Sequence, residues 1–217
     1  MTKKRVAVLI SGRGSNMAAL IEAAKDARYP AEITLVLSNR PAAAGLAAAR
    51  AAGIACAVVD HTAHGKDREA FEQAMQKLLD AHRIEILCLA GFMRLLTPAF
   101  VRHWRERMIN IHPALLPAFK GLDTHRRALS AGVKIHGASV HFVVEEMDCG
   151  PIIAQGAIAV GDDDDVVTLA ARVLAIEHRI YPAALALLAA GRITIVDGRC
   201  RIEGAQAAAG HLIVPEV

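Results

Sequence analysis

Five short runs of Val, Ile and Leu alternate with alanine-rich segments in the first half of the chain, and this alternation limits the fold most strongly. The runs read RVAVLI, EITLVL, IACAVV, IEILCLA and RMINIH. Continuous apolar runs of this length are typical of strands covered on both faces. The segments between them have helical spacing, as in NMAALIEAAKDA, AAAGLAAARAAG and DREAFEQAMQKLLDAH. The sequence therefore predicts an α/β, Rossmann-like fold with a doubly wound, mostly parallel sheet.

The pattern changes after Pro117. Two strand-like runs, Ala138 to Val144 and Ile152 to Val160, flank a polar turn and predict an antiparallel extension of the sheet. A helix is predicted from Val166 to about Ala190, and RITIVDGRCRI predicts a small terminal hairpin about its Asp-Gly pair.

Length and composition favour one soluble domain. The 217 residues are 54% hydrophobic and contain no linker or repeat, so a single domain over residues 1–217 is expected, with a loosely held tail at 204–217. The net charge of +3 is small and the basic residues are scattered, which argues against a nucleic-acid partner. No run approaches the ~20 apolar residues of a membrane helix, and the start lacks a signal peptide's apolar region. Four widely spaced cysteines indicate neither disulfides nor a zinc site, so a cytoplasmic location is expected.

The stretch NIHPALLP ends a predicted strand on two polar side chains. Proline lacks a backbone N–H and fixes its own φ, so Pro113 stops the ladder. Asn110 and His112 are two residues apart, and such side chains point to the same face of a strand. Ligands gather at the carboxyl ends of parallel strands. An amide and a protonated imidazole there suit the oxyanion that develops on a carbonyl oxygen during acyl transfer.

Asp148, in the turn EEMDCG, is the expected third group of this site. A carboxylate within ~4 to 6 Å of His112 would favour the imidazolium form, and it could relay protons through water. A structural alternative remains: Asn110 and His112 would satisfy turn amides, while Asp148 would fix a tight turn ahead of Gly150. The spacing of these residues leaves both interpretations open.

A second candidate site is the glycine loop in VLISGRGSNMAAL, which reads as strand, turn and helix. Exposed amide groups and the helix dipole would hold a phosphate at Gly14, Ser15 and Asn16. Met17 stands where the dinucleotide fingerprint has a third glycine, and the second strand ends in Asn39 instead of an acid. A mononucleotide or sugar phosphate is therefore favoured over a nicotinamide dinucleotide. Alternatively, the glycines only permit a tight turn, and Ser15 or Asn16 caps the helix.

Glu177 places a carboxylate on an otherwise apolar helical face, which contains Val166, Ala170, Val173, Ile180, Ala184 and Leu188. A buried carboxylate needs partners, and a ligand hydroxyl group or amine would serve. A position at the edge of the face, with the carboxylate reaching water, is the alternative.

No metal is predicted. The acidic run Asp162 to Asp165 precedes a helix, where capping and the helix dipole favour acids. His61 and His64 form H-x-x-H without a third ligand nearby. No base adjacent in the sequence would make Cys149 a nucleophile.

Together, LISGRGSN, LAGFMRLL, NIHPALLPAFKG, HGASVHFVVEEMDCGPII and EHRIYP closely resemble the motifs of the glycinamide ribonucleotide transformylases, also called phosphoribosylglycinamide formyltransferases. The resemblance keeps the family's motif order and extends to about Ile202. It implies the formyltransferase fold and an enzyme of purine biosynthesis and one-carbon metabolism. The implied reaction moves a formyl group from the co-substrate 10-formyltetrahydrofolate to the amino group of 5'-phosphoribosylglycinamide by direct attack of the amine.

The resemblance also implies residue roles. Asn110, His112 and Asp148 match the catalytic trio. The ribonucleotide would be held by Gly14, Ser15, Asn16 and Glu177. The folate would be held by Arg68, Met93, Arg94, Leu95, Leu96, Val144, Glu145, Glu146, Met147 and Asp148. The nucleotide-phosphate half would span about 1–105 and the folate and catalytic half about 106–203. Small-molecule substrates and a monomer or homodimer are expected.

The chain departs from the family at two positions. Asp123 stands where a histidine is common in bacterial members, and Cys149 stands where a glycine is common, which bears on the flexibility of the folate loop. Formyltetrahydrofolate hydrolases and methionyl-tRNA formyltransferases share the trio, but they carry an additional regulatory or RNA-binding domain that 217 residues would not accommodate. A non-catalytic mononucleotide-binding module would need only the glycine loop.

Overall fold

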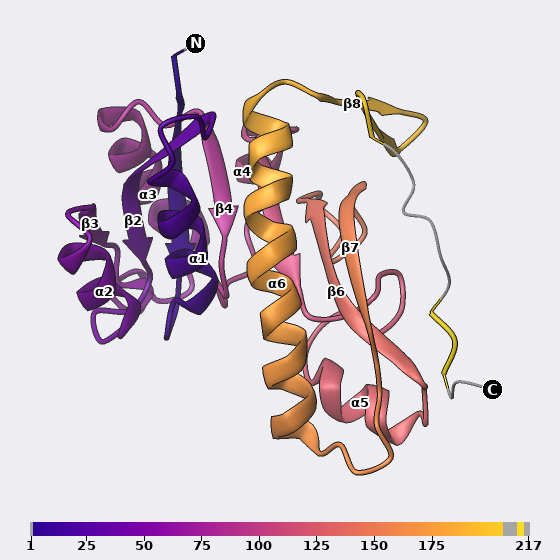
Figure 1. The fold of residues 1–217 in the computed structure, drawn as a ribbon. Coiled ribbons are helices and arrows are strands. Elements are labelled where there is room, and N and C mark those ends of the chain that lie inside the picture. Colours follow the sequence, from indigo (N-terminus) through magenta and orange to yellow (C-terminus); the bar gives the residue numbers. More distant parts are fainter. Residues whose placement is uncertain (1, 206–211, 215–217) are drawn as a thin grey trace. The chain divides into compact units, whose positions relative to one another are not determined.

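The structure is a computed structural model that describes residues 2–205 and 212–214 (Figure 1). Its helices and strands are β1 (Lys4–Ile10), α1 (Ser15–Ala24), β2 (Ala31–Ser38), α2 (Gly45–Ala51), β3 (Ala55–Val58), the 3₁₀ helix η1 (His61–His64), α3 (Arg68–Ala81), β4 (Ile86–Leu89), α4 (Pro98–His103), β5 (Met108–His112), α5 (Thr124–Ser130), β6 (Ile135–Phe142), β7 (Ile152–Ala159), α6 (Val166–Ala189), β8 (Ile193–Val196) and β9 (Arg199–Ile202).

Seven strands form one sheet in the order β3-β2-β1-β4-β5-β6-β7. The pairs among β1 to β5 are parallel, and β6 pairs with β7 in antiparallel fashion. The predicted mostly parallel sheet with an antiparallel extension is therefore confirmed. All five apolar runs of the first half became strands.

Contacts divide the chain into two units. The first reaches to Asn110 and includes Phe142–Glu145, and the second contains Ile111–His141 and continues from Glu146. The predicted single domain with halves meeting near residue 105 stays a prediction. Most of the predicted loose tail lies outside the described residues.

The first unit contains a reversal of strand order. The chain passes outward from β1 to β2 and β3, and then returns to place β4 on the other side of β1. The loops that follow β1 and β4 therefore leave the same edge of the sheet in opposite directions, and this topological switch point is where open α/β sheets bind ligands. The same unit contains an apolar core that includes Leu9, Leu37, Met75, Leu87 and Trp104.

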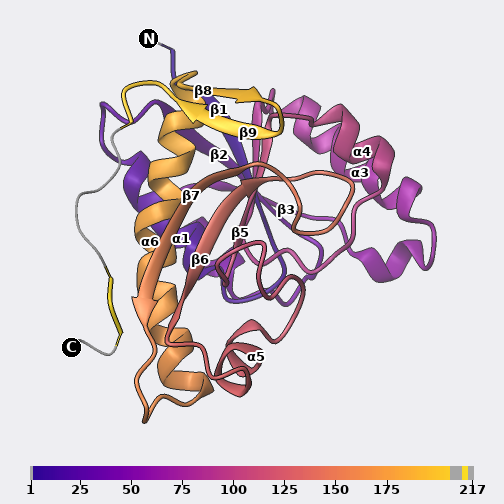
Figure 2. The ribbon, with the colours of Figure 1, turned by 90° about the vertical axis from the view of Figure 1, so that its right-hand side faces the viewer.

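The second unit packs α6 against β7 (Figures 1 and 2). Gly156 permits this contact, because a Cβ there would lie 2.2 Å from Ile176 Cγ2. The predicted strand Ala138–Val144 is wrong at both ends, since β6 covers Ile135–Phe142. Glycine usually weakens a strand, but at Gly137 the strand requires one. A Cβ there would lie 1.9 Å from the Gly156 carbonyl oxygen, so no larger residue fits.

Helix α6 and the terminal hairpin follow the sequence signals. Asp165 caps α6 by accepting hydrogen bonds from the N–H groups of Val167 and Thr168, which confirms capping for that residue of the acidic run. The turn between β8 and β9 holds Asp197 at φ 50° and Gly198 at φ 72°, as a two-residue hairpin loop requires. Strand β9 contacts β7 (Figure 2). Within residues 2–205 and 212–214, no helix is long and apolar enough to span a membrane.

Candidate active site

The glycine loop connects β1 to α1 in the first unit. Gly14 is the N-cap of α1 at φ 74°, a conformation that strongly favours glycine, and the cap makes no side-chain hydrogen bond. Ser15 and Asn16 therefore lie inside the helix instead of capping it, which removes the capping alternative. The N–H groups of a helix's first turn have no intrahelical acceptor, so they are available to an anion. The geometry suits a phosphate.

The loop after β4 contains the predicted folate segment Met93–Leu96. The Met93 N–H donates to Ser11 Oγ at 2.7 Å, and Ser11 Oγ donates to Asn39 Oδ1 at 2.6 Å. Thr97, which directly follows the segment, donates from both its N–H and its hydroxyl group to the buried carboxylate of Glu72. Between these ends, the side chains of Met93 and Leu95 are 57% and 63% exposed. The segment thus displays apolar side chains from a fixed backbone.

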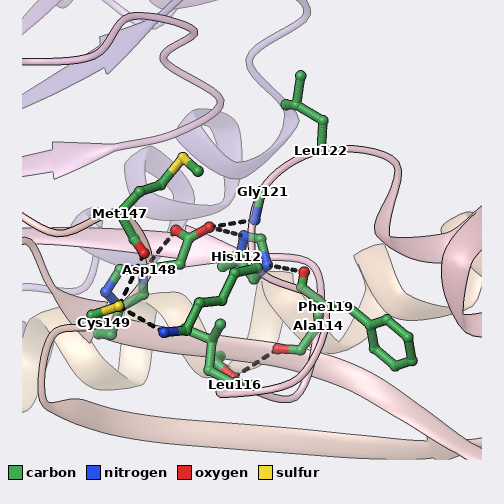
Figure 3. A network of polar contacts seen from close by, with 12 residues as sticks. His112, Ala114, Leu116, Phe119, Gly121, Leu122, Met147, Asp148 and Cys149 are labelled. Atoms are coloured by element: carbon green, nitrogen blue, oxygen red, sulfur yellow. Dashed lines mark hydrogen bonds and ion pairs between the residues drawn. The ribbon is translucent and has the colours of Figure 1, made fainter.

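His112 and Asp148 meet in the second unit (Figure 3). His112 Nδ1 lies 3.4 Å from Asp148 Oδ2, and His112 Nε2 lies 3.0 Å from the Phe119 carbonyl oxygen. Each ring nitrogen of His112 therefore lies close to an oxygen atom. Asp148 Oδ2 also accepts from the Gly121 N–H at 2.8 Å, and its Oδ1 lies 3.6 Å from His141 Nε2. The carboxylate lies within the distance expected from the sequence, while the catalytic roles of the two groups stay predictions.

The backbone around Asp148 has unusual conformations. Asp148 and Phe119 have φ values of 55° and 54°, in the left-handed region that few non-glycine residues adopt. Such residues persist only where surrounding contacts fix them, and they concentrate at functional sites. Here the fixing contacts are those of the Asp148 carboxylate and the Phe119 carbonyl oxygen.

A lysine contacts the cysteine that follows Asp148. Lys120 Nζ lies 2.7 Å from Cys149 Sγ, and this contact raises the pKa of Lys120. The Cys149 thiol also donates to the Met147 carbonyl oxygen at 3.2 Å. The turn that carries Asp148 is therefore tied to the segment after His112 through two neighbouring residues, Lys120 and Gly121.

Two more histidines lie beside this network. His136 is 1% exposed, and its ring stacks edge-to-face on those of Phe119 and His125. Burial lowers the pKa of His136 to about 4, repulsion from His125 and His112 adds to this, and a backbone contact with Pro113 opposes it. Burial, with His112 adding to it, also lowers the pKa of His125. These rings form a neutral backing for His112.

Two predicted site residues remain: Glu177 for the ribonucleotide and Asn110 for the catalytic trio. Glu177 is on α6 and is 7% exposed, as the prediction of a buried carboxylate requires. Val166, by contrast, is 37% exposed and does not belong to the buried face. Asn110 lies on β5 two residues before His112, at the end of the first unit. Its convergence with His112 and Asp148 stays a prediction.

The other folate candidates are exposed. Arg68 begins α3, where Asp67 caps the helix. Glu145 forms a 2.7 Å ion pair with Arg102, and both side chains are about half exposed. Val144 and Met147 are 36% and 54% exposed. The loop Val144–Asp148 crosses from one unit to the other, so its shape as a whole stays a prediction.

No group of three His, Cys, Asp or Glu side chains among the described residues could hold a metal ion. His61 has a structural contact instead: its Nδ1 lies 2.8 Å from the Asn39 carbonyl oxygen.

A model of the formyl transferase family matches residues 4–185. The chain belongs to this family. Among formyl transferases, the phosphoribosylglycinamide formyltransferase of Escherichia coli is 43% identical over 201 residues, which cover 92% of this chain and 93% of that protein. The human trifunctional purine biosynthetic protein adenosine-3 is 48% identical over 193 residues. The match covers 89% of this chain and only 19% of the human protein.

Solved structures with related sequences share the fold. Glycinamide ribonucleotide transformylase 1 from Symbiobacterium toebii has a TM-score of 0.89 at 44% identity, over 92% of this chain and 94% of that one. A formyltetrahydrofolate deformylase from Pseudomonas syringae has a TM-score of 0.85 at 27% identity, over 93% of this chain and 66% of that one.

The sequence patterns indicated no role for several residues that connect these loops and turns. Ser11 and Asn39 act through a side-chain contact between loops, and Glu72 lies on a helix face that reads as ordinary amphipathic surface. His141 offered a signal, because a histidine near the end of a buried strand occupies the same kind of position as His112. Lys120 offered none.

Proposed function

We propose that the protein transfers the formyl group of 10-formyltetrahydrofolate to the amino group of 5'-phosphoribosylglycinamide, a step of de novo purine biosynthesis. One observation carries the proposal: the chain is 43% identical to the E. coli phosphoribosylglycinamide formyltransferase over 93% of that enzyme. The contact between His112 and Asp148 supports it, because an imidazole beside a carboxylate suits general acid–base catalysis of acyl transfer.

In the proposed mechanism, the amine attacks the formyl carbon directly and no acyl group is bound to the enzyme. The imidazolium of His112 and the amide of Asn110 stabilise the oxyanion of the tetrahedral intermediate. Asp148 holds His112 Nδ1 and, through water, moves the proton from the attacking amine to the leaving nitrogen. In the structure, the Phe119 carbonyl oxygen accepts a hydrogen bond from His112 Nε2. If Nε2 donates to the oxyanion, the formyl oxygen must take the place of the Phe119 oxygen or share the N–H with it.

The binding roles follow the two loops of the first unit and the turn of the second. Gly14, Ser15 and Asn16 hold the phosphate, with Glu177 contacting the ribonucleotide. The exposed apolar side chains of Met93 and Leu95 cover the folate ring, together with Arg68, Arg94, Leu96 and the loop Val144–Asp148. Holding both substrates side by side supplies the orientation that a bimolecular reaction lacks.

The proposal extends to a cytoplasmic enzyme that acts as a monomer or homodimer, with folate as co-substrate and no metal. Free cysteines at all four positions fit a reducing compartment.

Folate product measured with and without the ribonucleotide tests the proposal. Release of tetrahydrofolate only in the presence of 5'-phosphoribosylglycinamide is expected. Release without the ribonucleotide would identify a hydrolase, the activity named for the Pseudomonas syringae relative. Absence of release under both conditions would contradict transfer and hydrolysis alike, and would leave a binding module.

A further inference from the structure

A single buried hydroxyl group joins two loops at the topological switch point of the first unit. Ser11 follows β1 directly and precedes the glycine loop, and it is 5% exposed. We propose that Ser11 is a positioning residue for both substrates, because it fixes the glycine loop and the segment Met93–Leu96 relative to each other. This inference rests on the proposed function, since it concerns the two binding loops assigned there.

A hydrogen bond from Met93 connects the folate segment to Ser11. Met93 N–H donates to Ser11 Oγ at 2.7 Å across a separation of 82 residues. Ser11 Oγ in turn donates to Asn39 Oδ1 at 2.6 Å, and Asn39 is fully buried. Removal of the hydroxyl group would leave a backbone donor and an amide oxygen without this partner, and buried polar groups are costly when unpaired. The loop backbone must then shift.

The Leu96 end of the segment Met93–Leu96 is fixed by a different buried side chain. Glu72 lies on α3, is 5% exposed and accepts from the Thr97 N–H at 2.6 Å. Thr97 also caps α4 by accepting from the Phe100 N–H. Met93–Leu96 is therefore held at both ends by buried side chains, and the Ser11 end joins it to the glycine loop.

The glycine loop cannot absorb a shift at Ser11, because it is closely packed on the start of α2. The Gly45 N–H donates to the Gly12 carbonyl oxygen at 3.0 Å. A Cβ added at Gly14 would lie 3.0 Å from Gly45 Cα, and one added at Gly45 would lie 3.2 Å from the Gly12 carbonyl oxygen. Close-packed backbone transmits displacement. A change at Ser11 therefore reaches Gly14, where the phosphate is proposed to bind.

Variants at two other side chains distinguish a positioning role of Ser11 from a general effect on stability. Glu72, on α3, bonds Thr97 at the end of the folate segment that is remote from Ser11. Thr34 lies on β2, outside both loops, and bonds β1 through its hydroxyl group, at 3.4 Å from the Val6 carbonyl oxygen. A residue that only supports the fold would lower the melting temperature without a selective loss of ligand affinity.

The experiment is a calorimetric titration of each variant with tetrahydrofolate and, separately, with 5'-phosphoribosylglycinamide. Ser11→Ala is expected to weaken binding of both ligands by about tenfold, because a backbone donor and a buried amide oxygen lose a partner. Glu72→Met is expected to weaken tetrahydrofolate alone, by roughly fivefold, for the same reason at one end of the segment. Thr34→Val is the matched control and leaves both affinities within about twofold, since its bond is long and distant from the loops.

If Ser11→Ala fails to fold, Asn39→Ala replaces it, with an expected loss of about threefold for both ligands because the Ser11–Met93 bond remains. Loss of affinity for one ligand only, or for neither, would overturn the positioning role. An absence of binding to the wild type would overturn it too. Turnover by the wild type tests the proposed function separately, because the titration needs no catalysis.

Discussion

The two polar networks of the molecule differ in what they hold in place. In the first unit, Ser11 and Glu72 accept hydrogen bonds from backbone N–H groups and so fix the shape of a segment. In the second unit, Asp148 contacts the ionisable rings of His112 and His141 from a left-handed backbone position. The first network suits loops that must keep their form, and the second suits groups that must exchange protons. Damage to the first should therefore appear in binding. Damage to the second should appear mainly in turnover, with a smaller effect on folate binding, because the turn that carries Asp148 belongs to the proposed folate loop.

The largest expected effect is on the second network. Asp148→Asn keeps an acceptor for the Gly121 N–H but removes the negative charge beside His112, and His112→Ala removes the oxyanion donor. We expect kcat to fall by roughly 10² to 10⁴-fold in each, with affinity for the ribonucleotide nearly unchanged. Steady-state kinetics and ribonucleotide titration measure the two quantities.

Asp162→Asn is the matched control for charge removal. Asp162 pairs with Lys134 at 2.6 Å, but its side chain is 88% exposed, so its loss should change kcat less than about twofold. Near-normal turnover in Asp148→Asn or His112→Ala would remove that residue from the mechanism.

The next largest effect is a loss of folding stability at acidic pH, which we expect to arise from His136 in the second unit. Burial and the neighbouring His125 and His112 lower the pKa of His136 to about 4 from the ordinary 6.5. The unfolded chain therefore binds more protons between these values, and stability is lost as the pH falls from 6.5 towards 4. At 1.36 kcal/mol per pKa unit, the contribution is roughly 3 kcal/mol.

Urea unfolding between pH 7.5 and 4 measures this dependence. His136→Phe keeps an aromatic ring against Phe119 but cannot be protonated. The fall in unfolding free energy should be smaller in this variant than in the wild type by that amount. Equal pH dependence in both proteins would show that His136 is not the group responsible.

A smaller effect is expected at the glycine loop. Gly14→Ala forces an alanine into φ 74° and places its Cβ 3.0 Å from Gly45 Cα. We expect the KM for the ribonucleotide to rise about tenfold, since left-handed backbone costs a non-glycine residue ~1 to 2 kcal/mol and the loop must move to relieve it. Gly53→Ala is the control, because Gly53 has φ 75° but open space around it. It should lower stability alone, and an equal rise in KM would contradict the phosphate role of Gly14.

The sequence predicted the elements well and the contacts between loops poorly. Strands β1 to β5 follow apolar runs, and Asp165 and Asp197-Gly198 mark a helix start and a hairpin turn by local chemistry. Helices α4 and α5, of 6 and 7 residues, are too short to show a periodic pattern. The bonds of Ser11 join residues 28 and 82 positions away, and nothing local to a serine indicates such partners. The pairing of His112 with Asp148 was found through the position of each at a strand end or turn, and through resemblance.

The smallest effect concerns a residue that departs from the family. Cys149 accepts a contact from Lys120 and stands next to Asp148, so it helps to fix the turn from which Asp148 acts. Cys149→Gly removes this contact and adds backbone freedom worth about 0.5 to 1 kcal/mol, so the KM for 10-formyltetrahydrofolate should rise two- to fivefold. Cys149→Ser keeps a polar atom for Lys120 and should stay within about twofold, because the backbone freedom is unchanged. If glycine and serine gave the same KM, the contact would have no part in shaping the turn, and the second network would depend on the Asp148 carboxylate alone.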